Sequence, residues 1–352
     1  MTALTQNETQ QSEHHGSPMV THLLAAGRLR RSVSRKIPVM LVLGFLLGVL
    51  VSVPVLADRE RVDQRMPFDG GRVSVSVVRG EVHVEGWDQN EIHVVGLLDE
   101  ETREFVFETS GNSARIQVKL PRNTHWCCSK GSDLHIRIPM KSRANVNVVS
   151  ADATVANLQD DTKITVVSGD ADVRSIVGAL NVGGVSGTVK AHDIEGDLSV
   201  NLVSGRLTAS ELVSGQINVS SVSGDIRLSD WLSDSISAGS VSGDINLSNG
   251  RFHHLKGRNV SGGLLLNSQM DNDGSASYNS VSGSITVIVD DIADTHISVE
   301  ARSGRIRNDL DGTPVTRNRY GPGRYLDIVN GSGERSYRLV SQSGRISVQG
   351  SD

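Results

Sequence analysis

The chain has 352 residues, a formal net charge of −5 and only 3% aromatic residues, whereas glycine occurs 36 times. The mild charge gives no reason to expect nucleic-acid binding, and the scarcity of aromatic residues argues against folds with large aromatic cores. Small aliphatic and β-branched side chains must therefore fill the interior.

The first 57 residues have the layout of an export signal. Polar residues 1–36 end in a basic cluster, and an apolar run follows over residues 37–53. Small side chains at Val55 and Ala57 then predict cleavage between Ala57 and Asp58. The apolar run is nearly long enough to span a bilayer, so an uncleaved inner-membrane anchor is the alternative. Either form places the rest of the chain in the periplasm or on the cell surface.

The segment after the export signal predicts a cap for a repeat fold. Residues 58–67 are interpreted as a linker and residues 68–133 as an N-terminal β capping segment, which a stacked-repeat protein needs to cover its first repeat. Val78-Arg79-Gly80 is a degenerate copy of the repeat motif described below, and residues 114–120 alternate between apolar and polar side chains. This pattern is typical of a strand with one buried face.

A predicted loop at residues 121–133 contains both cysteines of the chain, Cys127 and Cys128. Because neighbouring cysteines form only a strained disulfide, this candidate redox pair has three alternatives: free thiols, a vicinal disulfide, or pairing between chains. His125 beside the cysteines suggests a metal site, but three ligands within four residues lack the spacing of zinc motifs.

Residues 134–350 carry a Val-Ser-Gly repeat at intervals of 18 to 21 residues, with one double interval before the last copy. The first copy has Ala151 in place of glycine. The predicted structural turns are Ser168-Gly169, Ser186-Gly187, Ser204-Gly205, Ser223-Gly224, Ser242-Gly243, Ser261-Gly262, Ser282-Gly283, Ser303-Gly304 and Ser343-Gly344.

Apolar residues recur two and four positions after each glycine, as in Ala171 and Val173 or Ile226 and Leu228. A period of two within a repeat of fixed length predicts strands that stack into a continuous core. We expect an all-β, single-domain β-solenoid, a parallel β-helix with 18–21 residues per rung, preceded by the signal or anchor helix. Right-handed winding is expected from the general preference of parallel connections. Residues 309–335 interrupt the repeat, and residues 339–349 are expected to close the stack.

Two chemical functions are alternatives to this structural interpretation: nucleophilic catalysis by the serines and Ca²⁺ binding by the aspartates. Ten equivalent serines cannot all be nucleophiles, so the Ser-Gly pairs are predicted to be structural. Aspartate follows the turn at Asp152, Asp170, Asp225 and Asp244, and a carboxylate ladder of this kind could bind Ca²⁺. Thr188 and Arg206 interrupt that column, which favours ordinary turn aspartates in contact with solvent.

Arginines gather near the C-terminal end of the chain, where a basic face could meet an anionic envelope component. The alternative is an ordinary solvated face. They are Arg302, Arg305, Arg307, Arg317, Arg319 and Arg324.

Residues 80–88 (GEVHVEGWD), residues 134–139 (LHIRIP) and the VSGDI runs at 222–226 and 241–245 resemble the bacterial putative adhesin family. This is a domain of unknown function with β-strand repeats, related to the head GIN domain. The resemblance covers most of residues 68–350. It implies a β-helical fold and a cell-envelope location, and it brings no catalytic residues.

The sequence therefore predicts a non-enzymatic cell-envelope protein, an adhesin-like β-helical scaffold or binding module. No catalytic, cofactor-binding or metal-binding residues are predicted, and no cofactor. The expected partner is an envelope protein or a glycan, with membrane contact through the N-terminal segment if it is uncleaved, and no nucleic acid. The alternatives are a glycan-active β-helix lyase or hydrolase, and the extracytoplasmic sensor domain of an anchored protein.

Overall fold

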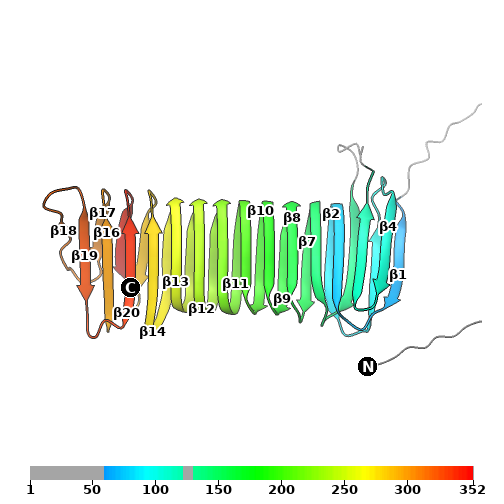
Figure 1. Ribbon diagram of the computed structural model, residues 1–352, viewed down its shortest axis with the longest axis horizontal. Coiled ribbons are helices and arrows are strands. Elements are labelled where there is room, and N and C mark those ends of the chain that lie inside the picture. Colours follow the sequence, from blue (N-terminus) through cyan, green and yellow to red (C-terminus); the bar gives the residue numbers. More distant parts are fainter. Residues whose placement is uncertain (1–58, 122–129, 352) are drawn as a thin grey trace, which may run out of the picture. The chain divides into compact units, whose positions relative to one another are not determined.

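The computed structural model describes residues 59–121 and 130–351, and 21 strands within these ranges join in one continuous sheet. Figure 1 shows these strands side by side along one axis, and from β7 to β14 they follow one another in chain order. The described residues contain no helix with the length and hydropathy needed to cross a membrane. The predicted export segment with Ala57 and Asp58, and the pair Cys127 and Cys128, lie outside the described residues.

Parallel pairing of equivalent residues builds the middle of the stack. The central strands are β7 (Arg143–Leu158), β8 (Thr162–Ser168), β9 (Ala171–Val177), β10 (Leu180–Glu195), β11 (Leu198–Ser223), β12 (Ile226–Ser242), β13 (Ile245–Ser261) and β14 (Leu264–Ser280). Ser168 pairs with Ser186, and Ser186 pairs with Ser204, so each repeat lies directly on the preceding one. This register confirms the predicted all-β stacked repeat.

The predicted apolar columns form the core. Ala171 and Val173 on β9 are 1% and 0% exposed, and their equivalents Ile226 and Leu228 on β12 are each 1% exposed. The columns end at β17 (Arg305–Asp309), where Ile306 and Asn308 are only half-buried. The pairings recorded for β17 join it to β21 alone, so it has a neighbouring rung on one side only.

Each rung also bends at a second column. Six non-glycine residues in this column adopt a left-handed backbone with φ between 52° and 61°, namely Asn157, Ser175, Asp193, Glu211, Asp230 and Asn249. Asn and Asp tolerate this conformation better than other non-glycine residues. The column explains why short polar side chains recur in mid-rung.

Antiparallel strands cap the N-terminal end. The first full rung is β2 (Arg72–Trp87), and its residues 72–85 pair in parallel with β7. Beyond β2 lie β6 (Ser132–Pro139), β3 (Glu91–Leu97) and β1 (Arg61–Pro67) on one side, and β5 (Ser113–Lys119) with β4 (Glu104–Ser110) on the other. The pairs β1–β3, β3–β6 and β4–β5 are antiparallel, so the parallel stack stops here.

The C-terminal end does not follow chain order. After β14 and β15 (Ile285–Val289), the next rung in space is β20 (Arg335–Ser341) with β21 (Arg345–Gly350). The earlier strands β16 (Thr295–Ala301) and β17 pack outside them. The antiparallel strand β19 (Arg324–Val329), with the short β18 (Thr316–Arg317), covers β16.

The prediction that residues 339–349 close the stack is therefore wrong. That segment is inserted inside the stack. The cap comes from residues 309–335, the segment that interrupts the repeat. Insertion gives β20 a partner on both sides, while the antiparallel β19 shields the edge of β16.

Candidate binding surface

Where a valine precedes the serine of the motif, its side chain points outward. Val166 is 2% exposed whereas its neighbour Val167 is 43% exposed, because successive side chains of a strand face opposite sides. The same holds in eight consecutive rungs, where these valines are 39% to 49% exposed. We call this column the valine stripe: Val149, Val167, Val185, Val203, Val222, Val241, Val260 and Val281.

The stripe is long and has few charges beside it. Strands in a sheet are about 4.8 Å apart, so eight rungs carry it over roughly 34 Å. The serines of the motif border it on one side, and Thr165, Gly183 and Ser220 stand in the column on the other side, which also includes Arg258. The next two rungs place polar Gln342 and Arg302 in line with it. Apolar surface in one continuous line is characteristic of contact surfaces.

The stripe borders a hollow at its C-terminal end. This hollow has a volume of about 430 Å³, and Val241, Val260 and Val281 contribute to its lining. Ser240 and Asn259 form part of its wall, and each is at least 95% buried. The valine stripe is therefore a ridge with an adjoining recess in this part.

The Ser-Gly pairs of the motif follow the stripe, and the pairs Ser186-Gly187 and Ser204-Gly205 lie within β10 and β11. Ser282 and Ser343 donate hydrogen bonds of 3.1 Å to carbonyl groups of the preceding rung, at Val260 and Val281, and Ser303 donates one of 2.8 Å to Gln342. The serine hydroxyl can therefore link neighbouring rungs, a role that goes beyond the turn itself.

The aspartates considered as a calcium ladder also bind the backbone. Asp152 Oδ1 accepts a 2.7 Å hydrogen bond from the N–H of Asp170, and Asp170 Oδ1 accepts one of 2.7 Å from Thr188. Asp244 Oδ1 does the same for Gly263 at 2.7 Å. These carboxylate oxygens accept hydrogen bonds from backbone N–H groups of the following rung. The aspartates therefore have a structural role beyond that of solvated turn residues.

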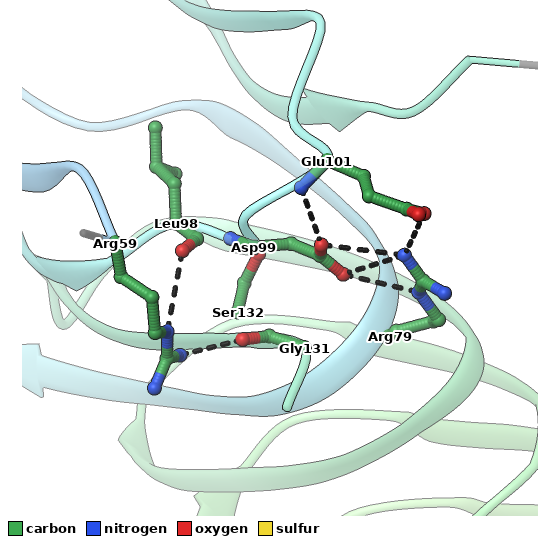
Figure 2. A network of polar contacts seen from close by, with 7 residues as sticks. All are labelled: Arg59, Arg79, Leu98, Asp99, Glu101, Gly131 and Ser132. Carbon is green, nitrogen blue, oxygen red and sulfur yellow. Dashed lines mark hydrogen bonds and ion pairs between the residues drawn. The ribbon is translucent and has the colours of Figure 1, made fainter. Parts of the chain in front are cut away.

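Arg79 stands where the repeat has its serine, and its side chain forms a buried ionic network (Figure 2). Its guanidinium lies 3.0 Å from Asp99 and 2.8 Å from Glu101, and its side chain is 8% exposed. Burial opposes the charge, but the hydrogen bonds to Glu101 and Asp99 outweigh it and raise the pKa of Arg79. Ser132 Oγ accepts the backbone N–H of Asp99. Sequence reasoning missed this network, although a lone arginine in a serine column was a usable signal.

The C-terminal arginines are partly neutralised. Arg302 lies 3.5 Å from Glu300, Arg307 is paired with Asp309, and Arg324 donates to the carbonyl of Gly304. These contacts reduce the charge available to an anionic partner.

Three described carboxyl groups near the C-terminal end have lowered pKa values. The pKa shifts resolved for carboxyl groups in residues 59–121 and 130–351, those of Asp291, Asp294 and Asp311, are all downward. Each of these groups accepts hydrogen bonds that favour its charged form.

The Toastrack DUF4097 family matches residues 71–349, which is most of the chain. The chain belongs to this family. The predicted resemblance to a family of repeated β-strands is thereby confirmed. A search of curated proteins found no match.

Solved structures similar to the chain include two bacterial proteins. A putative adhesin from Bacteroides fragilis is 11% identical, with 83% of this chain and 98% of that chain covered and a TM-score of 0.40. A putative lipid binding protein from Parabacteroides distasonis is 13% identical, with 81% and 96% covered and a TM-score of 0.40. Likeness of this degree carries no argument about function.

Proposed function

We propose that the protein is a non-enzymatic, adhesin-like scaffold of the cell envelope that associates with a second copy of itself along the valine stripe. The observation that carries the proposal is the exposure of eight valines in consecutive rungs. The proposal includes export by the N-terminal segment, with cleavage after Ala57 or anchoring by residues 37–53, and a right-handed coil.

A second copy fits the stripe because both surfaces have the same rung spacing. Two stripes related by a two-fold axis bring valine against valine over their whole length, which is the self-complementary contact of a symmetric dimer. The Ser and Gly columns beside the stripe add little charge repulsion. Antiparallel strands cover the edge of β3 at one end of the stack and the edge of β16 at the other, which disfavours end-to-end growth at these edges.

The chemistry of the stripe favours a protein over a sugar as the partner. Valine offers no polar group to a sugar hydroxyl and no ring for stacking, whereas it packs well against another apolar surface. A single narrow stripe gives a modest contact, and many copies at an envelope surface would strengthen it through avidity.

Sedimentation equilibrium over a wide concentration range tests the proposal. We expect the purified protein to dimerise and the triple variant Val203→Lys/Val222→Lys/Val241→Lys to remain monomeric. The matched control is Thr208→Lys/Gln216→Lys/Ser237→Lys, which adds the same charge at exposed positions of β11 and β12. Circular dichroism should show the same β content in all three proteins. A monomeric wild type, or equal dimerisation of both triple variants, would overturn the proposal.

A further inference from the structure

Two histidines and two carboxylates cluster on the outer face of the sheet where β2 meets the cap strand β6. His83 on β2 and His135 on β6 are register partners on parallel strands, and so are Glu81 and Asp133. The two imidazole rings stack with centroids 4.5 Å apart and planes 9° apart. His83 Nε2 lies 3.8 Å from Glu81 Oε2, and His135 Nε2 lies 3.6 Å from Asp133 Oδ1.

One ligand atom from each of His83, Asp133 and His135 lies within 4.8 Å of the others. In a tetrahedral zinc site with bonds of about 2.0–2.1 Å, neighbouring ligand atoms are about 3.4 Å apart. Small side-chain rotations close this difference, because the three side chains are partly exposed, at 37%, 49% and 63%. The paired strands meanwhile hold their backbones in place.

The two rings also lack the hydrogen bonds that other histidines make. His93, His192, His254 and His296 each bond to an aspartate or serine side chain at 2.8 to 3.1 Å. Within the described residues, no contact of hydrogen-bond length holds the imidazole nitrogens of His83 or His135, and the nearest carboxylate oxygens lie at 3.6 Å or more. These nitrogens are therefore available to a ligand.

The surrounding charge favours a cation. Asp152 on β7 is the register partner of Glu81, whereas Val95 and Leu97 on β3 lie opposite His135 and Asp133. Arg137 lines the same hollow as His83 and His135, but its charge is partly balanced by Glu85. Its guanidinium lies 3.9 Å from Glu85 and 5.7 Å from the Trp87 ring. The carboxylates of Glu81 and Asp133 thus lie beside the two imidazoles, whereas Asp152 Oδ1 accepts the backbone N–H of Asp170.

We infer that His83, His135 and Asp133 bind a divalent transition-metal ion of the zinc type, with Glu81 as the nearest further ligand. Two imidazole nitrogens and a carboxylate suit Zn²⁺, whereas Ca²⁺ and Mg²⁺ require oxygen ligands. The ion would join the first rung, β2, to the cap strand β6. It would therefore stabilise the end of the solenoid as well as occupy a surface site.

Calorimetric titration of the chelator-treated, tag-free protein with ZnCl₂ tests this site. The titration uses a Cys127→Ser/Cys128→Ser background, so that zinc binding by the cysteines does not contribute to the signal. We expect His83→Ala, His135→Ala and Asp133→Asn each to remove one bound ion per chain or weaken its binding at least about tenfold, since even outer partners of metal ligands contribute 10–100-fold. His192→Ala is the matched control, an exposed histidine beside Glu211 that should change nothing.

Two further readouts distinguish a built site from loose association. Co²⁺ should give the strong visible absorption of a tetrahedral site in the background protein and lose it in His83→Ala/His135→Ala. Zn²⁺ should raise the melting temperature of the background protein but not of that double variant. Equal zinc stoichiometry and affinity in the background protein and the double variant would overturn the inference, as would loss of all zinc binding on removal of the cysteines.

Discussion

The backbone of Gly205 passes so close to Gly187 that a Cβ atom at Gly205 would lie 1.9 Å from the carbonyl oxygen of Gly187. Gly205 also has φ +147°, which L-residues with side chains rarely adopt. The glycine of the motif is thus required by the approach of two rungs as well as by the bend.

We predict that Gly205→Ala destabilises the protein by about 3 kcal/mol or more, because both the clash and the backbone conformation oppose the methyl group. Gly183 lies in the same stack, and a Cβ atom there would meet nothing within 4 Å. Gly183→Ala should therefore change stability by less than about 1 kcal/mol. Urea unfolding measures both, and similar midpoints for the two variants would contradict the prediction.

The Arg79–Asp99 pair should be costly to break from one side. Asp99 is 1% exposed in its side chain, so Arg79→Met removes an ion pair and two hydrogen bonds from a buried carboxylate. We expect a loss of about 3–5 kcal/mol in unfolding free energy. The control is Arg65→Met, whose partner Glu91 lies at 2.8 Å near the surface and should contribute less than about 1 kcal/mol. A small effect at Arg79 would mean that the network is not a structural element of the cap.

The aspartate after the turn should stabilise the bend by its hydrogen bond. Asp170→Ala removes the acceptor for the N–H of Thr188, and we expect a loss of about 1 kcal/mol. Asp170→Asn keeps an oxygen acceptor and should restore most of that loss. Asp234→Ala, at another exposed strand position, should change stability by less than about 0.5 kcal/mol. Thermal unfolding of the three variants checks this ranking, which equal effects of Ala and Asn at position 170 would refute.

The turn between β19 and β20 should loosen in acid. The backbone N–H and the hydroxyl of Ser332 hold the pKa of Asp294 below its ordinary value of 3.8. Because the folded pKa is lowered, the stabilisation is present above the unfolded pKa and is lost as the pH falls through the folded one.

Hydrogen exchange at the Ser332 amide measures this effect. Its protection should fall between neutral pH and about pH 3, after correction for the intrinsic exchange rate. Asp294→Asn keeps an acceptor but cannot titrate, so the fall should be smaller in that variant. Unchanged protection in the wild-type protein down to that pH would show that the ionisation of Asp294 does not hold this turn.

The sequence by itself determined the fold class, the rung length and the core columns. Equivalent residues at intervals of 18 to 21 can bury their apolar faces only by stacking, so Ala171, Ile226 and their equivalents had to point inward. It also determined that one of two adjacent valines, Val166 and Val167, faces outward, because strands alternate. It did not determine which one, since the Ser-Gly bend breaks the alternation between the two sides of the motif.

Only the tertiary structure decided the rest. The insertion of β20 and β21 inside the stack depends on strand pairings between segments far apart in the chain, and a repeat pattern carries no information about the order of rungs in space. The stacking of His83 on His135, like the pairing of Arg79 with Asp99, joins residues 52 and 20 positions apart, and each requires the register of the cap strands. The repeat specifies each rung through local spacing, whereas the sites lie where non-local pairing replaces that repeat.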